Sequence, residues 1–155
     1  MSNILTAVRL ALIARLETIT TANGYLTNVG GNVKSGWFNE VIKQGSAGSG
    51  LLVLQRAPDG EPMRGAEAVK LRRGFRVVAG VDAGLDSYEA SLEDIEADLL
   101  RCLMPAPGQH ISWLPKGCPA FTVGKPDAYP PGEGQPAATV LLPLTIDVII
   151  EDPGQ

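Results

Sequence analysis

The most constraining feature of this sequence is the alternation of apolar and mixed positions over residues 138–151. Every second residue there is apolar: Val140, Leu142, Leu144, Ile146, Val148 and Ile150. The positions between them hold Thr139, Leu141, Pro143, Thr145, Asp147, Ile149 and Glu151. A period of two predicts one long β-strand with a buried face and a mixed face. Pro143 has no N–H group for a ladder, which predicts that this strand lies at a sheet edge or is bulged there.

A second long strand is predicted over residues 68–81, because apolar and basic residues alternate in its first part. Gly74 within it is expected to mark a bulge. Residues 51–56 predict a compact strand, and residues 57–62, which contain Pro, Asp and Gly, predict a turn after it.

Two shorter strands are predicted at residues 25–29 and 32–37. They would flank a Gly-Gly pair at 30–31, which is typical of a two-residue hairpin turn. Residues 38–43 fit no single pattern, and residues 44–50 predict a flexible loop.

An amphipathic helix is predicted over residues 3–20. Apolar residues at spacings of three and four form its stripe: Leu5, Val8, Leu12, Leu16 and Ile19. Ser2 or Asn3 is expected to cap its start, and Asn23-Gly24 is expected to stop it.

A second helix is predicted over residues 91–103, where apolar residues again share one face: Leu92, Ile95, Leu99 and Leu103. Acidic residues crowd its N-terminal half, mostly off this face, where the helix dipole favours them. Ser91 and Asp94 resemble a capping box at its start.

The order of predicted elements is one helix, several strands, one helix and several strands, without regular βαβ alternation. This order predicts an α+β fold, a mostly antiparallel sheet with two helices packed on one face. A single domain is expected over residues 1–155, with a Pro/Gly-rich loop at about 115–136. Residues 111–114 and 120–123 are candidate strands.

The composition is that of a globular protein, with 45% apolar and 19% charged residues among 155 and a formal net charge of −4. The acidic balance argues against a reader of duplex DNA. No apolar run approaches the roughly 20 residues of a membrane helix. Two cysteines allow one disulfide but do not make a disulfide framework, so a reduced compartment is expected. Arg9 and Arg15 interrupt the N-terminal apolar stretch, so no export signal is expected.

The motifs that usually carry chemistry are incomplete. The glycines at 30–31 precede Lys34-Ser35, but a phosphate loop needs a glycine directly before the lysine and a helix after it. Cys102, His110 and Cys118 lack the close cysteine pair of a structural zinc site, and Cys102 is expected to be a core residue. His110 is the only histidine, and no nucleophile elbow is present. We therefore expect no catalytic residue, no cofactor and no metal.

Charge is distributed unevenly along the chain. Residues 34–76 hold eight basic and four acidic residues, whereas residues 77–98 hold seven acidic residues and no basic one. Two interpretations stay open: two solvated faces, or a basic edge that meets the acidic edge of the next subunit in a ring. The candidate interface residues, with a neighbouring subunit or a tube, are Lys70, Arg72, Arg73, Arg76, Glu93 and Glu96. Lys70, Arg72 and Arg76 share one strand face unless Gly74 shifts the register.

Three segments together resemble the tail terminator proteins of long-tailed bacteriophages, the minor tail protein U class. They are "TTANGYLTNVGGNVKSG" after the first helix, the acidic helix "SLEDIEADLLRCL" and the terminal run "ATVLLPLTIDVII". In order, they span most of the chain.

The resemblance implies a structural virion protein that assembles as a ring, with a hexamer expected. Such a ring caps the tail tube, stops tail polymerisation and provides the surface that joins the head. Its partners would be copies of itself, the tail tube protein and a head completion or neck protein, with genomic DNA passing through the lumen without sequence-specific binding and no membrane contact. The chain would be found in the host cytoplasm during assembly and then at the tail–neck junction. The alternatives are another head–tail connector or completion protein and, from a different class, a small enzyme or ligand-binding domain.

Overall fold

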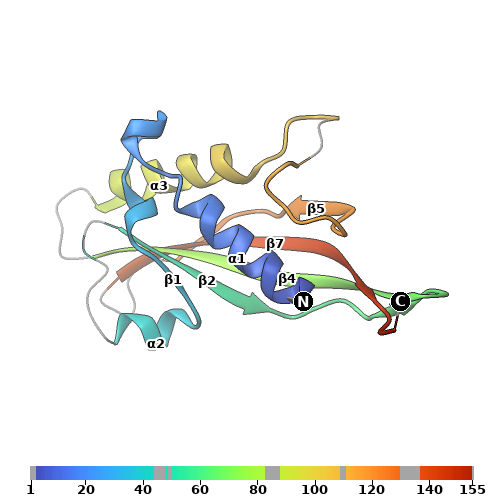
Figure 1. The fold of residues 1–155 in the computed structure, drawn as a ribbon. Helices are drawn as coiled ribbons and strands as arrows, with labels where there is room; N and C mark the ends of the chain where they lie inside the picture. Colours follow the sequence, from blue (N-terminus) through green and yellow to red (C-terminus); the bar gives the residue numbers. More distant parts are fainter. Residues whose placement is uncertain are drawn as a thin grey trace.

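Two long antiparallel strands form the centre of the molecule. The computed structural model describes residues 3–43, 48, 50–82, 88–108, 111–129 and 137–154. Strands β4 (Ala68–Asp82) and β7 (Ala137–Glu151) are each 15 residues long and pair with each other over their whole length. Figure 1 shows both strands running the full width of the fold.

Shorter strands extend this pair into a sheet of seven strands in the order β1-β2-β4-β7-β5. The elements on this path are β1 (Val33–Ser35), β2 (Leu51–Ala57) and β5 (Ala120–Val123). Strand β3 (Met63–Arg64) pairs with β4, and β6 (Asp127–Tyr129) pairs with β7. Among the described strands, β1 and β2 alone pair in parallel, so the predicted, mostly antiparallel α+β fold is confirmed.

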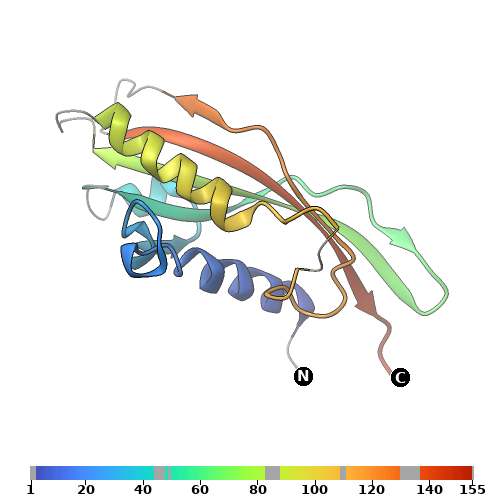
Figure 2. The same ribbon diagram turned by 90° about the horizontal axis from the view of Figure 1, so that it is seen from above.

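Two helices cover one face of the sheet, as predicted, and a short third helix lies on the other face. Helices α1 (Ile4–Leu16) and α3 (Tyr88–Leu103) share the larger core with the odd-numbered residues of β4. Helix α2 (Phe38–Ile42) packs against Leu51, Val53 and Val78 in a separate, smaller core. Figure 2 shows α1 and α3 side by side over the sheet. The segment that fitted no single pattern is therefore this short helix.

The predicted alternation in β7 is confirmed on the helix-covered face. Its apolar phase packs into the larger core: Val140, Leu142, Leu144, Ile146, Val148 and Ile150. The other phase lies on what we call the outer face of the sheet, which α2 covers only at one end. Burial of the apolar phase fixes the register, because a slip of one residue would turn the whole apolar set outward.

The prediction that β7 lies at an edge or is bulged at Pro143 is wrong, because β7 has neighbours on both sides. The Pro143 carbonyl accepts a hydrogen bond of 2.8 Å from the Gly124 backbone N–H. In an antiparallel strand, the N–H and C=O of one residue point toward the same neighbour. The missing donor therefore faces residues 124–126, between β5 and β6, where the ladder is already interrupted.

The bulge predicted at Gly74 is also absent, since both ladders of β4 keep an unbroken register through this residue. Gly74 is needed for a different reason. A Cβ atom there would lie 2.4 Å from the Pro58 carbonyl oxygen, so the chain passes too close for a side chain.

The predicted hairpin at residues 25–37 is wrong. Residues 25–28 are not a strand, and Val29–Gly31 form a single 3₁₀ turn, which leads into β1. Strand β1 then pairs in parallel with β2, so no hairpin forms. The glycines and β-forming residues of this segment are local signals, and they do not show that the Ile19 carbonyl and the Asp98 carboxylate hold the segment in place.

Helix boundaries differ from the predictions at two ends, the end of α1 and the start of α3. Asn3 caps α1 through its side chain, but α1 ends at Leu16, and Gly24 (φ +90°) instead closes a 3₁₀ turn at Thr21–Asn23. Helix α3 begins at Tyr88, so Ser91 lies inside it and the predicted capping box is wrong.

Several further expectations concern the connecting segments. Residues 120–123 form a strand, whereas residues 111–114 do not. Ser2, most of the 44–50 loop, His110 and residues 130–136 lie outside the described residues. Within the described part of the chain, no helix has the length and apolar character of a membrane span.

Candidate functional site

Three of the four predicted basic residues share the outer face of the sheet. The unbroken register of β4 places Lys70, Arg72 and Arg76 on the same side, opposite the larger core. Arg73 points the other way and is only 7% exposed. Its guanidinium lies 3.1 Å from Asp59, and burial lowers its pKa more than this carboxylate raises it. Arg73 is thus a structural residue, and the basic surface contains the other three.

Asp147 of the neighbouring strand β7 contacts two of these three basic residues. Its carboxylate lies 3.0 Å from Nε of Arg72 and 3.5 Å from Nζ of Lys70. The hydrogen bond from Arg72 is the main cause that lowers the pKa of Asp147, and the charge of Lys70 adds to it. Side-chain exposures are 7% for Asp147, 46% for Lys70 and 64% for Arg72. Both cations are therefore exposed to solvent, whereas the carboxylate that they share is buried.

A shallow depression of about 170 Å³ adjoins this cluster. It is lined by Gly60, Glu61, Met63, Lys70, Arg72 and Asp147. Met63 pairs directly with Lys70 across the β3–β4 ladder and is 66% exposed. We define the arm patch as Met63, Lys70 and Arg72, on the outer face of the sheet where β3 pairs with β4.

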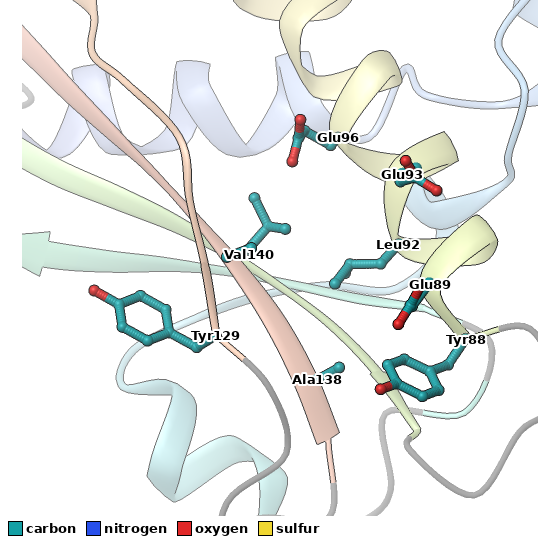
Figure 3. A pocket seen from close by; sticks show the side chains of 9 residues that line it. Tyr88, Glu89, Leu92, Glu93, Glu96, Tyr129, Ala138 and Val140 are labelled. Carbon is teal, nitrogen blue, oxygen red and sulfur yellow. The ribbon is translucent and has the colours of Figure 1, made fainter.

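The predicted acidic residues line a larger groove of about 370 Å³, which we call the α3 groove (Figure 3). Its walls are the N-terminal part of α3 and strands β6 and β7. The lining residues are Tyr88, Glu89, Leu92, Glu93, Glu96, Ala128, Tyr129, Ala138 and Val140. The groove therefore has an apolar floor, two phenol rings and three carboxylates.

Helical spacing explains why the three carboxylates gather. Glu89, Glu93 and Glu96 follow one another at intervals of four and three residues, which places them on one helix face. Within the described ranges, none of the ion pairs involves any of the three. Glu93 and Glu96 were predicted interface residues, whereas Glu89 was not singled out.

Asp98 is the residue that sequence reasoning missed. It is fully buried, and its carboxylate accepts hydrogen bonds from the backbone N–H groups of Leu26 and Thr27 at 3.0 and 2.8 Å and from the Thr27 hydroxyl at 2.8 Å. It fastens the 3₁₀-containing segment to α3. One signal was available: Asp98 follows Ile95 by three residues and precedes Cys102 by four, so it occupies the buried stripe of the helix.

The other motifs have structural places. Lys34 and Ser35 lie on β1, and the Gly30 N–H donates to the Ile19 carbonyl. Cys102 is buried against the Arg15 carbonyl and the Thr18 hydroxyl, which confirms the core prediction. Cys118 is half-buried, and burial raises the pKa of its thiol. The described residues contain no group of three or more side chains suited to a metal ion.

No protein-family model matches the chain, and no curated protein matches it either. The function is therefore inferred from the fold, from the two charged surfaces and from the resemblance of three sequence segments to phage tail terminator proteins. The structure thus brings the predicted residues together at two places, Lys70 and Arg72 in the arm patch and Glu93 and Glu96 beside the α3 groove.

Proposed function

We propose that the chain is a structural protein of a phage tail, a tail terminator that forms a ring on the last layer of the tail tube. A hexamer is the expected ring, because the resembled family assembles in that way. In this role the ring stops tube polymerisation and offers its other side to a head completion or neck protein. Genomic DNA passes through the lumen, and the protein itself carries out no chemical step.

The observation that carries the proposal is the placement of the two charged surfaces. Lys70, Arg72 and Arg76 lie on the outer face of the sheet, whereas Glu89 and Glu93 lie on a helix that covers the other face. Copies joined through two different surfaces assemble head to tail, and such contacts close into a ring when the rotation permits. A pair of self-complementary patches on one face would instead favour a two-fold dimer.

The fold supports the same role. The strands β4 and β7 form a long pair of 15 residues each, whose β3–β4 end extends beyond the helices (Figure 1), a shape able to bridge neighbouring subunits. The acidic groove and the basic patch are both exposed to solvent in the single chain.

The first test is the mass of the purified chain in solution, alone and with tail tubes. A closed ring of about six copies, formed alone or on tubes, supports the proposal. The second test is removal of the gene from its phage, followed by measurement of tail lengths in electron micrographs. Tails of uncontrolled length without heads are expected. A chain that stays monomeric on tubes, together with unchanged tails, would refute the proposal.

A further inference from the structure

The α3 groove has the chemistry of a site for a cationic, partly apolar segment of protein. Leu92, Ala138 and Val140 supply an apolar floor, and three carboxylates lie along α3 on one side of it (Figure 3). Tyr88 and Tyr129 add two rings, and a lysine or arginine is attracted to the face of such a ring. A purely hydrophobic ligand would leave the carboxylates without counter-charge, and a small cation would leave the apolar floor exposed.

The arm patch has the complementary composition. Met63 presents an exposed, flexible apolar side chain, and Lys70 and Arg72 lie beside it in the same depression. Asp147 is shared by both cations and Glu61 also lines the depression, so the patch offers an exposed cation at Lys70 rather than a net positive charge. Lys70 is the more easily released cation, because its Nζ lies 3.5 Å from Asp147 whereas Arg72 makes a hydrogen bond of 3.0 Å. Lys70 is 46% exposed, and Asp147 keeps Arg72 as a partner, so exchanging the partner of Lys70 costs little.

The two surfaces of one chain cannot meet. Lys70 pairs with Ile149 of β7, and the groove is lined by Val140 of the same strand. These two positions are nine residues apart in a strand, which corresponds to about 30 Å. The patch also lies on the outer face of the sheet, whereas α3 covers the opposite face. Any contact between patch and groove therefore joins two copies.

We propose that the α3 groove of one copy receives the arm patch of the next copy. This inference rests on the proposed ring and names the two surfaces that build it. Met63 packs on the apolar floor, the Lys70 ammonium lies among Glu89, Glu93 and Glu96 beside the tyrosine rings, and Arg72 remains on Asp147. The contact uses different surfaces on the two copies, so each subunit keeps one patch and one groove for its two neighbours.

A charge exchange tests the contact. Lys70→Glu and Glu93→Lys are each expected to weaken self-association at least about tenfold, because each places like charges together in the contact. The double variant is expected to assemble again. An equimolar mixture of the two single variants is also expected to assemble, because in an alternating ring with an even number of subunits every contact joins one acid with one base. Masses are measured by sedimentation, and Lys116→Glu, the same charge change at another exposed position, serves as the control.

A crosslink provides a second measurement that does not depend on charge. Chains carrying Met63→Cys and chains carrying Glu93→Cys are mixed in a Cys118→Ser background and oxidised mildly. The expected product is a disulfide between the two kinds of chain. Circular dichroism of each variant checks that it is folded.

The outcomes separate this contact from the proposed function. If the wild-type chain forms a ring, both single variants form it equally well and no crosslink appears, the proposed contact is overturned and the proposed ring stands. A wild-type chain that is monomeric at all concentrations overturns both. Rescue and crosslinking in open filaments support the contact and overturn the terminator ring. A groove cysteine that crosslinks to the tail tube protein instead of a second copy overturns the contact.

Discussion

At the scale of single residues, Gly30 is fixed by backbone atoms that precede it by more than ten positions. It is buried, its N–H donates to the Ile19 carbonyl at 2.8 Å, and a Cβ atom would lie 2.6 Å from that oxygen and 2.7 Å from the Glu17 carbonyl oxygen. Backbone atoms cannot move aside as a flexible side chain can. The adjacent Gly31 is exposed, and a Cβ atom there would meet nothing within 4 Å.

We expect Gly30→Ala to lower the free energy of unfolding by about 2 kcal/mol, the usual cost of overpacking a site that cannot yield. Gly31→Ala is the matched control and should change it by less than about 0.5 kcal/mol. Urea unfolding of both variants measures the difference. Equal effects at the two positions would contradict this explanation.

Asp98 is the second residue whose role depends on distant groups. Asp98→Ala leaves two backbone N–H groups and one hydroxyl without their acceptor, so we expect a loss of about 3 kcal/mol in the free energy of unfolding. Hydrogen exchange at Leu26 and Thr27 should accelerate in the same variant. Asp94→Ala, an exposed change on the same helix, should alter stability by less than about 0.5 kcal/mol. Unchanged exchange at Leu26 and Thr27 would show that Asp98 does not hold this segment.

At the scale of elements, β4 and β7 are joined by more than their ladder. Arg72 lies directly across from Asp147 of β7, Lys70 lies two residues along β4, and both reach the Asp147 carboxylate on the outer face of the sheet. The same pair carries apolar residues toward α1 and α3 on its other face. The β4–β7 pair is therefore held by the charged cluster on its outer face and by the apolar core on the face that α1 and α3 cover.

This cluster predicts a pH dependence. The pKa of Asp147 is lowered in the folded chain, so its contribution to stability is fully present above the ordinary carboxyl pKa of about 4 and is lost as the pH falls through its lower folded value. Asp147→Asn should therefore be less stable than the wild type at neutral pH, and the difference should shrink as the pH falls below about 4. Urea unfolding of both chains at several pH values measures it. A difference that does not change with pH would show that the charge of Asp147 is not involved.

At the scale of the whole molecule, the exposed cations of the arm patch and the carboxylates of the α3 groove lie at opposite ends and on opposite faces of one sheet. The acidic α3 groove lies near one end of β7, and the arm patch lies near the other, on the opposite face. Figure 2 shows this extended arrangement, with the β3–β4 end away from the start of α3. Among the described residues, no ion pair involves the carboxylates of the α3 groove, and Lys70 of the same chain lies too far away to reach them, so a contact between copies can supply their counter-charge.

We therefore expect assembly to weaken with salt. Raising the ionic strength from about 0.1 M to 1 M shortens the screening length from about 10 Å to about 3 Å, which weakens exposed charge pairs. Sedimentation across this range should show dissociation of the ring, and the double variant Lys70→Glu with Glu93→Lys should show the same trend. An oligomer that is equally stable at both ends of the range would indicate an apolar interface instead.

The sequence by itself determined the fold class and most of the long elements. The period of two over β7 and the first part of β4, and the periods of three and four in α1 and α3, are local properties of the chain, and each follows from which side of one element is buried. The shared face of Lys70, Arg72 and Arg76 followed from the same period.

Only the tertiary structure decided the features that depend on residues far apart in the chain. Gly30 and Gly74 are required by backbone atoms of other segments, and Pro143 is tolerated in an interior strand because its neighbour is interrupted there. Asp98 is buried because α3 packs on the segment that it binds. The α3 groove needs two strands beside the helix. Periodicity reports which face of an element is covered, but it does not report what covers it, and these residues are defined by their partners.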